Sequence, residues 1–227
     1  MAKRVLLLKP GVTSSRAVLG DYEHWFTRAC GGEEAVSLQP VELHAGEAPP
    51  PLAGFDGVIM TGSPLSVTAR VDWMERAADY LLDASEKKPV LGVCFGHQLL
   101  AWRHGAGVIK NPKGRELGTV SVELTEAGRR AALFSEFPSR FDVQATHYDI
   151  VTEVPGITVL ASNEVCGVQA FSRGARTFGV QFHPEMDAAS IGYCIESKDT
   201  LEEDRVRAVA RETPWGARLL QRFIEIC

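Results

Sequence analysis

Apolar runs of two lengths alternate along the first half of the chain. Short, nearly continuous apolar runs predict four buried strands, at residues 4–8, 36–43, 55–62 and 89–94. Longer stretches with apolar residues at helical spacing predict three helices, one from Ala17 to near Gly31 and two at residues 70–85 and 97–105. Strands that alternate with helices are typical of parallel βαβ units.

The pattern changes in the second half of the chain. Residues 117–124 alternate between apolar and polar, which predicts a strand with one solvent-facing side. Three further short strands are predicted, at residues 156–162, 166–171 and 176–182. The stretch from Leu201 is charged at first and then becomes an amphipathic helix. We expect a single α/β domain over residues 1–227, with a mixed, mainly parallel central sheet and helices on both faces.

Composition narrows the class of protein and its partners. The chain has 227 residues, of which 45% are hydrophobic and 23% charged, as is usual for a soluble enzyme. A formal net charge of -5 argues against nucleic acid or an anionic membrane as a partner. The five cysteines include no C-x-x-C pair, and no apolar run is long enough for a signal peptide or a membrane span. We therefore expect a cytoplasmic location.

Three of the predicted strands end in unusual loops, at residues 60–66, 92–98 and 182–187. In α/β sheets, ligands bind beyond the carboxyl ends of the strands. The three loops are therefore expected to meet at one edge of the sheet.

The second loop contains Cys94 between two glycines, in the pattern Gly92-Val93-Cys94-Phe95-Gly96. Its serine counterpart is the nucleophile elbow, a tight turn from a strand into a helix whose neighbours must be small. The start of the following helix would favour the thiolate, and the N–H of Phe95 could bind an oxyanion. The alternative is a buried structural cysteine, but the flanking glycines favour a nucleophile.

His97 is near Cys94 in sequence, but the sulfur of an elbow projects away from the flank of the following helix. His183 is the better base, because Glu185 two positions later faces the same side of an extended chain. The alternatives are a surface pair or half of a metal site. The zinc signatures H-x-E followed by P-C-x-x-C and H-E-x-x-H are absent, so neither a metal nor another cofactor is expected.

Two further segments are candidates for the same edge. The sequence Thr61-Gly62-Ser63-Pro64 suits a second oxyanion donor, although it could also be a plain turn. His147 is expected in a loop that could line the site.

In the order "TGSP", "GVCFGHQ" and "FHPE", these motifs resemble the class I (triad) glutamine amidotransferases. The segments "KGRELGTVSVEL" and "THYDIVTEVPG" are also similar to the family, so the resemblance covers most of the chain. It is strongest to the glutaminase part of GMP synthase and its stand-alone relatives. It implies a flavodoxin-like sheet, with Cys94 as nucleophile, His183 as base and Glu185 as the residue that orients the base.

The resemblance also implies an oxyanion hole and a substrate site. The backbone N–H groups of Ser63 and Phe95 match the oxyanion hole. The residues that match substrate contacts are Gln98, Leu65, His147 and Tyr148. Ser63 and Tyr148 replace glycines that are common in the family.

The implied reaction is hydrolysis of the glutamine side-chain amide through a cysteinyl γ-glutamyl thioester, with release of ammonia. Only a helical extension over about residues 187–227 follows the H-P-E motif, too short for a synthase domain, so we expect a separate acceptor protein. One alternative is a γ-glutamyl peptidase or hydrolase that uses the same triad. A second is a non-catalytic regulatory or binding module, which is less expected because all three triad residues are present.

Overall fold

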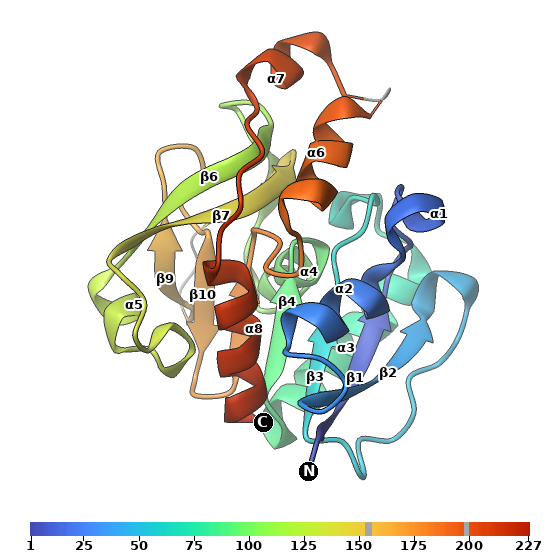
Figure 1. Cartoon of the computed structure of the whole chain (residues 1–227). Helices are drawn as coiled ribbons and strands as arrows, with labels where there is room; N and C mark the ends of the chain where they lie inside the picture. Colours follow the sequence, from blue (N-terminus) through green and yellow to red (C-terminus); the bar gives the residue numbers. More distant parts are fainter. Residues whose placement is uncertain (153–155, 198–199) are drawn as a thin grey trace.

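The computed structural model describes residues 1–152, 156–197 and 200–227 (Figure 1). Residues 153–155, at the end of the "THYDIVTEVPG" segment, and residues 198–199 of the C-terminal extension lie outside this description. Nine strands form one central sheet in the order β2-β1-β3-β4-β11-β10-β9-β6-β7.

One half of the sheet is parallel and the other is antiparallel. The parallel strands are β1 (Lys3–Lys9), β2 (Val36–Glu42), β3 (Gly57–Met60), β4 (Val90–Val93) and β11 (Thr177–Val180). The antiparallel strands are β10 (Ala170–Arg173), β9 (Thr158–Ser162), β6 (Glu116–Leu124) and β7 (Arg140–His147). A separate small ribbon pairs β5 (Val108–Lys110) with β8 (Asp149–Val151). The expected α/β class with a mainly parallel central sheet is confirmed.

Helices cover both faces of the parallel strands, so the inner strands β1, β3, β4 and β11 are buried on both sides, whereas the edge strand β2 is partly exposed. In β1, Val5 and Leu7 pack into one core, whereas Leu6 and Leu8 pack into the other. The helices of the first core are α2 (Tyr22–Ala29) and α8 (Trp215–Ile226), and those of the second are α3 (Asp72–Lys87) and α4 (Phe95–Arg103).

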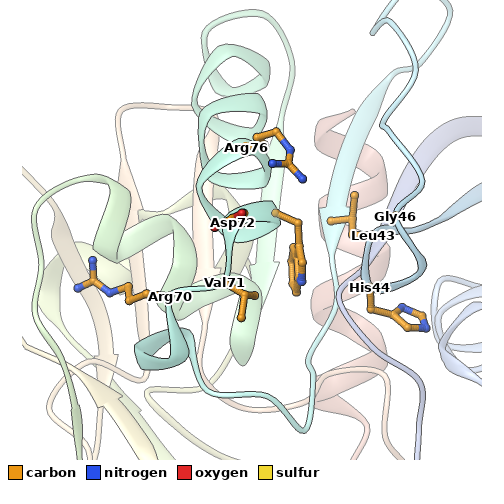
Figure 2. Close-up of a pocket in the computed structure, with 8 residues that line it drawn as sticks. Leu43, His44, Gly46, Arg70, Val71, Asp72 and Arg76 are labelled. Carbon is orange, nitrogen blue, oxygen red and sulfur yellow. The ribbon is translucent and has the colours of Figure 1, made fainter.

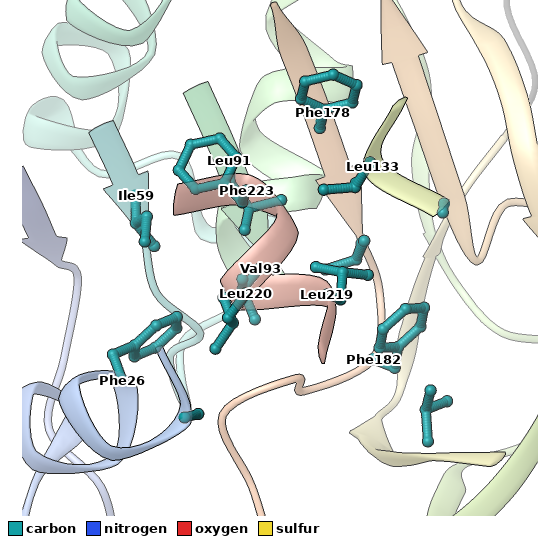
Figure 3. Packing of buried hydrophobic residues seen from close by; sticks show 14 of the residues in the cluster. Phe26, Ile59, Leu91, Val93, Leu133, Phe178, Phe182, Leu219, Leu220 and Phe223 are labelled. Carbon is teal, nitrogen blue, oxygen red and sulfur yellow. The ribbon is translucent and has the colours of Figure 1, made fainter. Parts of the chain in front are cut away.

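The C-terminal helix α8 contributes directly to the first core. Leu219, Leu220 and Phe223 are wholly buried. Figure 3 shows these side chains beside Leu91 and Val93 of the central strand β4. The last helix of the chain is therefore packed on the strand that leads to Cys94.

The remaining short elements lie around the sheet. They are α1 (Arg16–Leu19), α5 (Glu126–Arg130), α6 (Ala188–Glu196), α7 (Glu202–Arg207), η1 (Leu43–Ala45), η2 (Val67–Ala69) and η3 (Ala132–Phe134). In Figure 1, α6 and α7 lie beyond the carboxyl ends of the parallel strands. Among the helices of the described residues, none is long and apolar enough to span a bilayer.

Three expectations about individual elements were wrong. The helix predicted from Ala17 to near Gly31 is two helices, because Gly20 has a φ of 82° and Asp21 starts α2 by accepting the N–H of Tyr22 at 2.9 Å. The strand predicted at residues 166–171 begins only at Ala170. His147 is not in a loop: it is the last residue of β7.

Candidate active site

The three unusual loops meet at one edge of the sheet, as expected. They follow the neighbouring strands β3, β4 and β11. Gly62 lies between the other two loops: a Cβ built on it would be 2.7 Å from Cε1 of His183 and 3.5 Å from Cβ of Cys94. Residues that are 32 and 121 positions from Gly62 in sequence are thus its immediate neighbours.

Cys94 occupies the tight turn between β4 and α4. Its φ of 48° and ψ of -98° are strained for a residue with a side chain. A Cβ on Gly92 would be 2.4 Å from the carbonyl oxygen of Gly96, and one on Gly96 would be 2.5 Å from that of Met60. Both flanking glycines are therefore required by close backbone contacts, as the elbow pattern predicts.

The start of α4 points at Cys94. Phe95 is the first residue of this helix, so its N–H has no carbonyl acceptor within the helix. On the other side, the hydroxyl of Ser63 donates to the carbonyl oxygen of Pro10 at 3.2 Å and accepts the N–H of Leu65 at 3.1 Å. The side chain of Ser63 thus connects the loop after β3 to the loop after β1. The backbone N–H of Ser63 takes no part in these two hydrogen bonds.

His183 and Glu185 form a buried pair next to Cys94. Nδ1 of His183 is 2.8 Å from Oε1 of Glu185, and the two residues are 3% and 2% exposed. Burial opposes a charge on the imidazole, but the neighbouring Glu185 and Cys94 outweigh it and raise the pKa of His183 well above its ordinary value. Cys94 is also a hydrogen-bond partner of this imidazole. The sulfur, imidazole and carboxylate therefore form one connected unit.

His97 is not part of that unit. Its side chain is wholly buried and packs on Phe171, with ring centroids 5.0 Å apart. Burial lowers the pKa of His97 to about 3, so the imidazole is neutral. His97 supports the turn through packing.

Gln98 has a defined orientation. Its Nε2 donates to the carbonyl oxygen of Asp149 at 3.0 Å and to Oε1 of Gln181 at 3.2 Å. The side-chain NH₂ is therefore engaged within the protein, and the oxygen of the amide remains to accept a hydrogen bond.

The other three substrate candidates differ in exposure. Leu65 and Tyr148 are 45% and 40% exposed. The guanidinium of Arg115 lies 4.8 Å from the ring centroid of Tyr148. His147 is buried, and its side chain contacts Glu116 rather than open space.

Sequence patterns did not identify Glu116, Gln181 and Asp149, which contact the candidate residues directly. Glu116 lies within the "KGREL" segment, but its partner His147 is 31 positions further along the chain. Gln181 is the first residue after β11 and lies two positions before His183. A polar residue directly after a buried strand is a signal that could have identified Gln181 as a site candidate.

A groove of about 530 Å³ opens beside the site, between η1 and the start of α3 (Figure 2). Its lining residues are Leu43, His44, Gly46, Arg70, Val71, Asp72, Trp73 and Arg76. Trp73 stacks on Phe95 with ring centroids 5.9 Å apart. The groove is therefore adjacent to the elbow, but its lining does not include Cys94.

The described part of the chain holds no group of three or more His, Cys, Asp or Glu side chains that could bind a metal ion.

Most of the chain is similar to proteins of one known family. Residues 25–196 match the family described as glutamine amidotransferase class-I. The chain is 34% identical over 137 residues to gamma-glutamyl peptidase 3 of Arabidopsis thaliana, covering 58% of this chain and 55% of that protein. It is 31% identical over 181 residues to a glutamine-hydrolyzing GMP synthase subunit from Methanococcus vannielii, covering 78% and 88%. The matched region thus spans little more than half of the Arabidopsis protein.

A similar structure extends the match to nearly the full length. A glutamine amidotransferase from Thermotoga maritima superposes with a TM-score of 0.76 at 25% identity, covering 99% of both chains. The family match includes the loops that carry Cys94 and His183. The chain therefore belongs to the class I glutamine amidotransferase family.

Proposed function

We propose that this protein hydrolyses the side-chain amide of glutamine through a thioester on Cys94 and releases ammonia to a separate acceptor protein. The observation that carries the proposal is the connected unit of Cys94, His183 and Glu185, with a 2.8 Å contact between imidazole and carboxylate. It is supported by membership of the family and by the tight turn at Cys94.

The first half of the reaction forms the thioester. The raised pKa of His183 makes its imidazole a strong acceptor for the proton of Cys94, so that proton transfer gives a thiolate beside an imidazolium. The thiolate attacks the γ-carbonyl carbon, and the N–H groups of Ser63 and Phe95 bind the developing oxyanion. His183 then donates its Nε2 proton to the departing nitrogen, so that the C–N bond breaks and ammonia leaves.

The second half of the reaction restores the enzyme. His183 takes a proton from a water molecule, and the resulting hydroxide attacks the thioester carbonyl. The C–S bond breaks, glutamate is released and the Cys94 thiolate re-forms opposite the imidazolium. Glu185 keeps Nδ1 of His183 protonated throughout, which leaves Nε2 for both proton transfers.

In this proposal, the amino-acid end of the substrate binds on the side of the site away from Cys94 and His183. Under the same proposal, the side-chain oxygen of Gln98 accepts a hydrogen bond from the α-ammonium group, since the NH₂ group of Gln98 donates to Asp149 and Gln181. The backbone of Leu65, His147 and Tyr148 completes this end. Because the N–H of Leu65 already donates to Ser63, its carbonyl group is the one available to the substrate.

A γ-glutamyl peptidase is the second candidate function. It is favoured by the 34% identity to a gamma-glutamyl peptidase and by the exposed Tyr148, an aromatic ring at a position where the family commonly has glycine. The same thioester chemistry would apply, with an amine of a peptide or conjugate as the leaving group in place of ammonia.

The two candidates are separated by a substrate comparison on the purified chain. Ammonia release from glutamine and hydrolysis of γ-glutamyl dipeptides are measured with the wild type and with Cys94→Ala. Preference for glutamine supports the amidotransferase reaction, and preference for the dipeptides supports the peptidase. Turnover that survives Cys94→Ala contradicts both.

A further inference from the structure

A buried polar network lies directly behind the segment that we assign to the substrate's amino-acid end. Its centre is the carboxylate of Glu116, which is 5% exposed and lies opposite His147 in the antiparallel pairing of β6 and β7. One carboxylate oxygen accepts hydrogen bonds from Nε2 of His147 at 2.9 Å and from the side-chain amide of Gln169 at 2.7 Å. The other oxygen accepts the side-chain amide of Asn163.

These contacts hold the carboxylate of Glu116 in one orientation. All three of its partners can donate a hydrogen bond to it. Nδ1 of His147 faces another acceptor, the carbonyl oxygen of Asp149, at 3.1 Å. Both ring nitrogens of His147 therefore face oxygen atoms, one of Glu116 and one of the backbone. Glu116 and His147 are a buried, hydrogen-bonded pair whose orientation is fixed on every side.

The pair is connected to the substrate site through a single carbonyl group. The carbonyl oxygen of Asp149 accepts hydrogen bonds from both His147 and Gln98, at 3.1 and 3.0 Å. The position of this oxygen determines where the NH₂ group of Gln98 is held and thus which way its free oxygen points. It also fixes the backbone between His147 and Asp149, which includes Tyr148.

We propose that Glu116 is a positioning residue for the substrate's amino-acid end, acting through His147 and the Asp149 carbonyl. The proposal rests on the proposed function, because it assumes that a γ-glutamyl compound binds between Gln98 and Cys94. The reacting end is held separately by the Cys94 turn and His183. Loss of Glu116 is therefore expected to weaken recognition of the amino-acid end and to leave the reactivity of the sulfur intact.

The test compares two electrophiles on Cys94 and needs no acceptor protein. The glutamine analogue 6-diazo-5-oxonorleucine carries the amino-acid end, whereas iodoacetamide does not. In Glu116→Gln, the rate of labelling by the analogue is expected to fall about tenfold or more, the size expected for a lost charge-assisted hydrogen bond. The rate with iodoacetamide is expected to change by less than about threefold.

Two results would overturn the positioning role. One is an equal loss with both electrophiles, which would indicate general disturbance of the site. The other is an unchanged rate with both. If wild-type Cys94 shows no preference for the analogue over iodoacetamide, the proposed function fails as well, and this is seen before any variant is made.

Breaking a buried ion pair on one side can unfold a protein, so a second variant is included. In Glu116→Gln/His147→Gln both partners of the contact are replaced together. The double variant should show a loss no greater than that of the more impaired single variant, because both residues act through one carbonyl group. Additive losses would contradict the proposal.

Thr125→Ala is the matched control for reduced stability. The Thr125 hydroxyl accepts the N–H of Gly128 at 3.0 Å and caps α5, away from the substrate segment. This variant should unfold more easily than the wild type, with an unchanged ratio of the two labelling rates. A changed ratio would mean that the ratio reports stability rather than recognition.

Discussion

Gly62 is the glycine of the site that lies against both Cys94 and His183. There is no room for a methyl group at this position: a Cβ would lie 2.7 Å from the imidazole. Gly62→Ala should displace His183 from the sulfur and lower kcat/KM by about 100-fold, since small misplacements of reacting groups have effects of this order. The measurement is turnover of glutamine and of γ-glutamyl dipeptides.

A matched glycine provides the control for this substitution. A Cβ on Gly167 would meet nothing within 4 Å. Gly167→Ala should therefore keep wild-type activity. If Gly62→Ala remained within about threefold of wild type, the assignment of His183 as the base would be wrong.

His97 offers a second prediction at the residue scale, through the pH dependence of stability. Its pKa is lowered from an ordinary value of 6.5 to about 3 by burial, so the unfolded chain binds a proton below pH 6.5 that the folded protein does not bind. The stabilising contribution of the neutral imidazole is present above pH 6.5 and is lost as the pH falls toward 3. Relative to His97→Met, the wild type should lose roughly 2 kcal/mol more of its unfolding free energy between pH 7 and pH 5.

Urea unfolding of both proteins at the two pH values measures this difference. His97→Met should also retain activity within about tenfold, because His97 supports the turn and is not the base. If the unfolding free energies of the two proteins changed equally between pH 7 and pH 5, His97 would have to take up a proton in the folded protein as it does in the unfolded chain, which would contradict the lowered pKa. Complete loss of turnover in a folded His97→Met variant would contradict this role and would make His97 a candidate for the base.

At the scale of elements, α8 contributes to the core behind the catalytic strand. Phe223 is wholly buried in the cluster that also contains Leu91 and Val93 of β4 (Figure 3). Phe223→Ala should lower the free energy of unfolding by about 3–5 kcal/mol, through lost burial and the remaining cavity. Gln221→Ala on the same helix should stay within about 0.5 kcal/mol of wild type. Similar values for the two variants would mean that α8 is not part of this core.

The local patterns of the sequence were sufficient for most elements and for the turn at Cys94. Flanking glycines at a strand–helix junction are a local signal, and the close contacts of Gly92 and Gly96 account for it. The pairing of His183 with Glu185 was also predicted, but not for the right reason: residues 184–185 form a turn, in which the N–H of Met186 donates to the carbonyl oxygen of His183 at 3.4 Å, and not an extended chain. Their roles in the reaction stay a prediction.

Features that depend on distant partners or on one backbone angle were not predictable in this way. The helix expected from Ala17 to near Gly31 is divided by a positive φ at Gly20. The strand expected from Cys166 starts later, because the Asn163 side chain accepts the N–H of Cys166 at 2.7 Å and forms a turn. The contact of Glu116 with His147 depends on the pairing of β6 and β7, which no local pattern encodes.

For the molecule as a whole, one covalent intermediate is central. The elements that form the site come from both halves of the chain, and the carboxyl ends of β3, β4 and β11 bring them together. If this assembly performs the proposed reaction, a γ-glutamyl group must be carried by the sulfur of Cys94 in every turnover. A binding module with the same fold would carry none.

The most direct measurement is therefore mass spectrometry of the intact, acid-quenched protein after mixing with glutamine or a γ-glutamyl dipeptide. We predict a mass increase of one γ-glutamyl group, located on the peptide that contains Cys94, in the wild type and not in Cys94→Ala. Turnover of either substrate with no such adduct, or with an adduct on another residue, would contradict the proposed reaction.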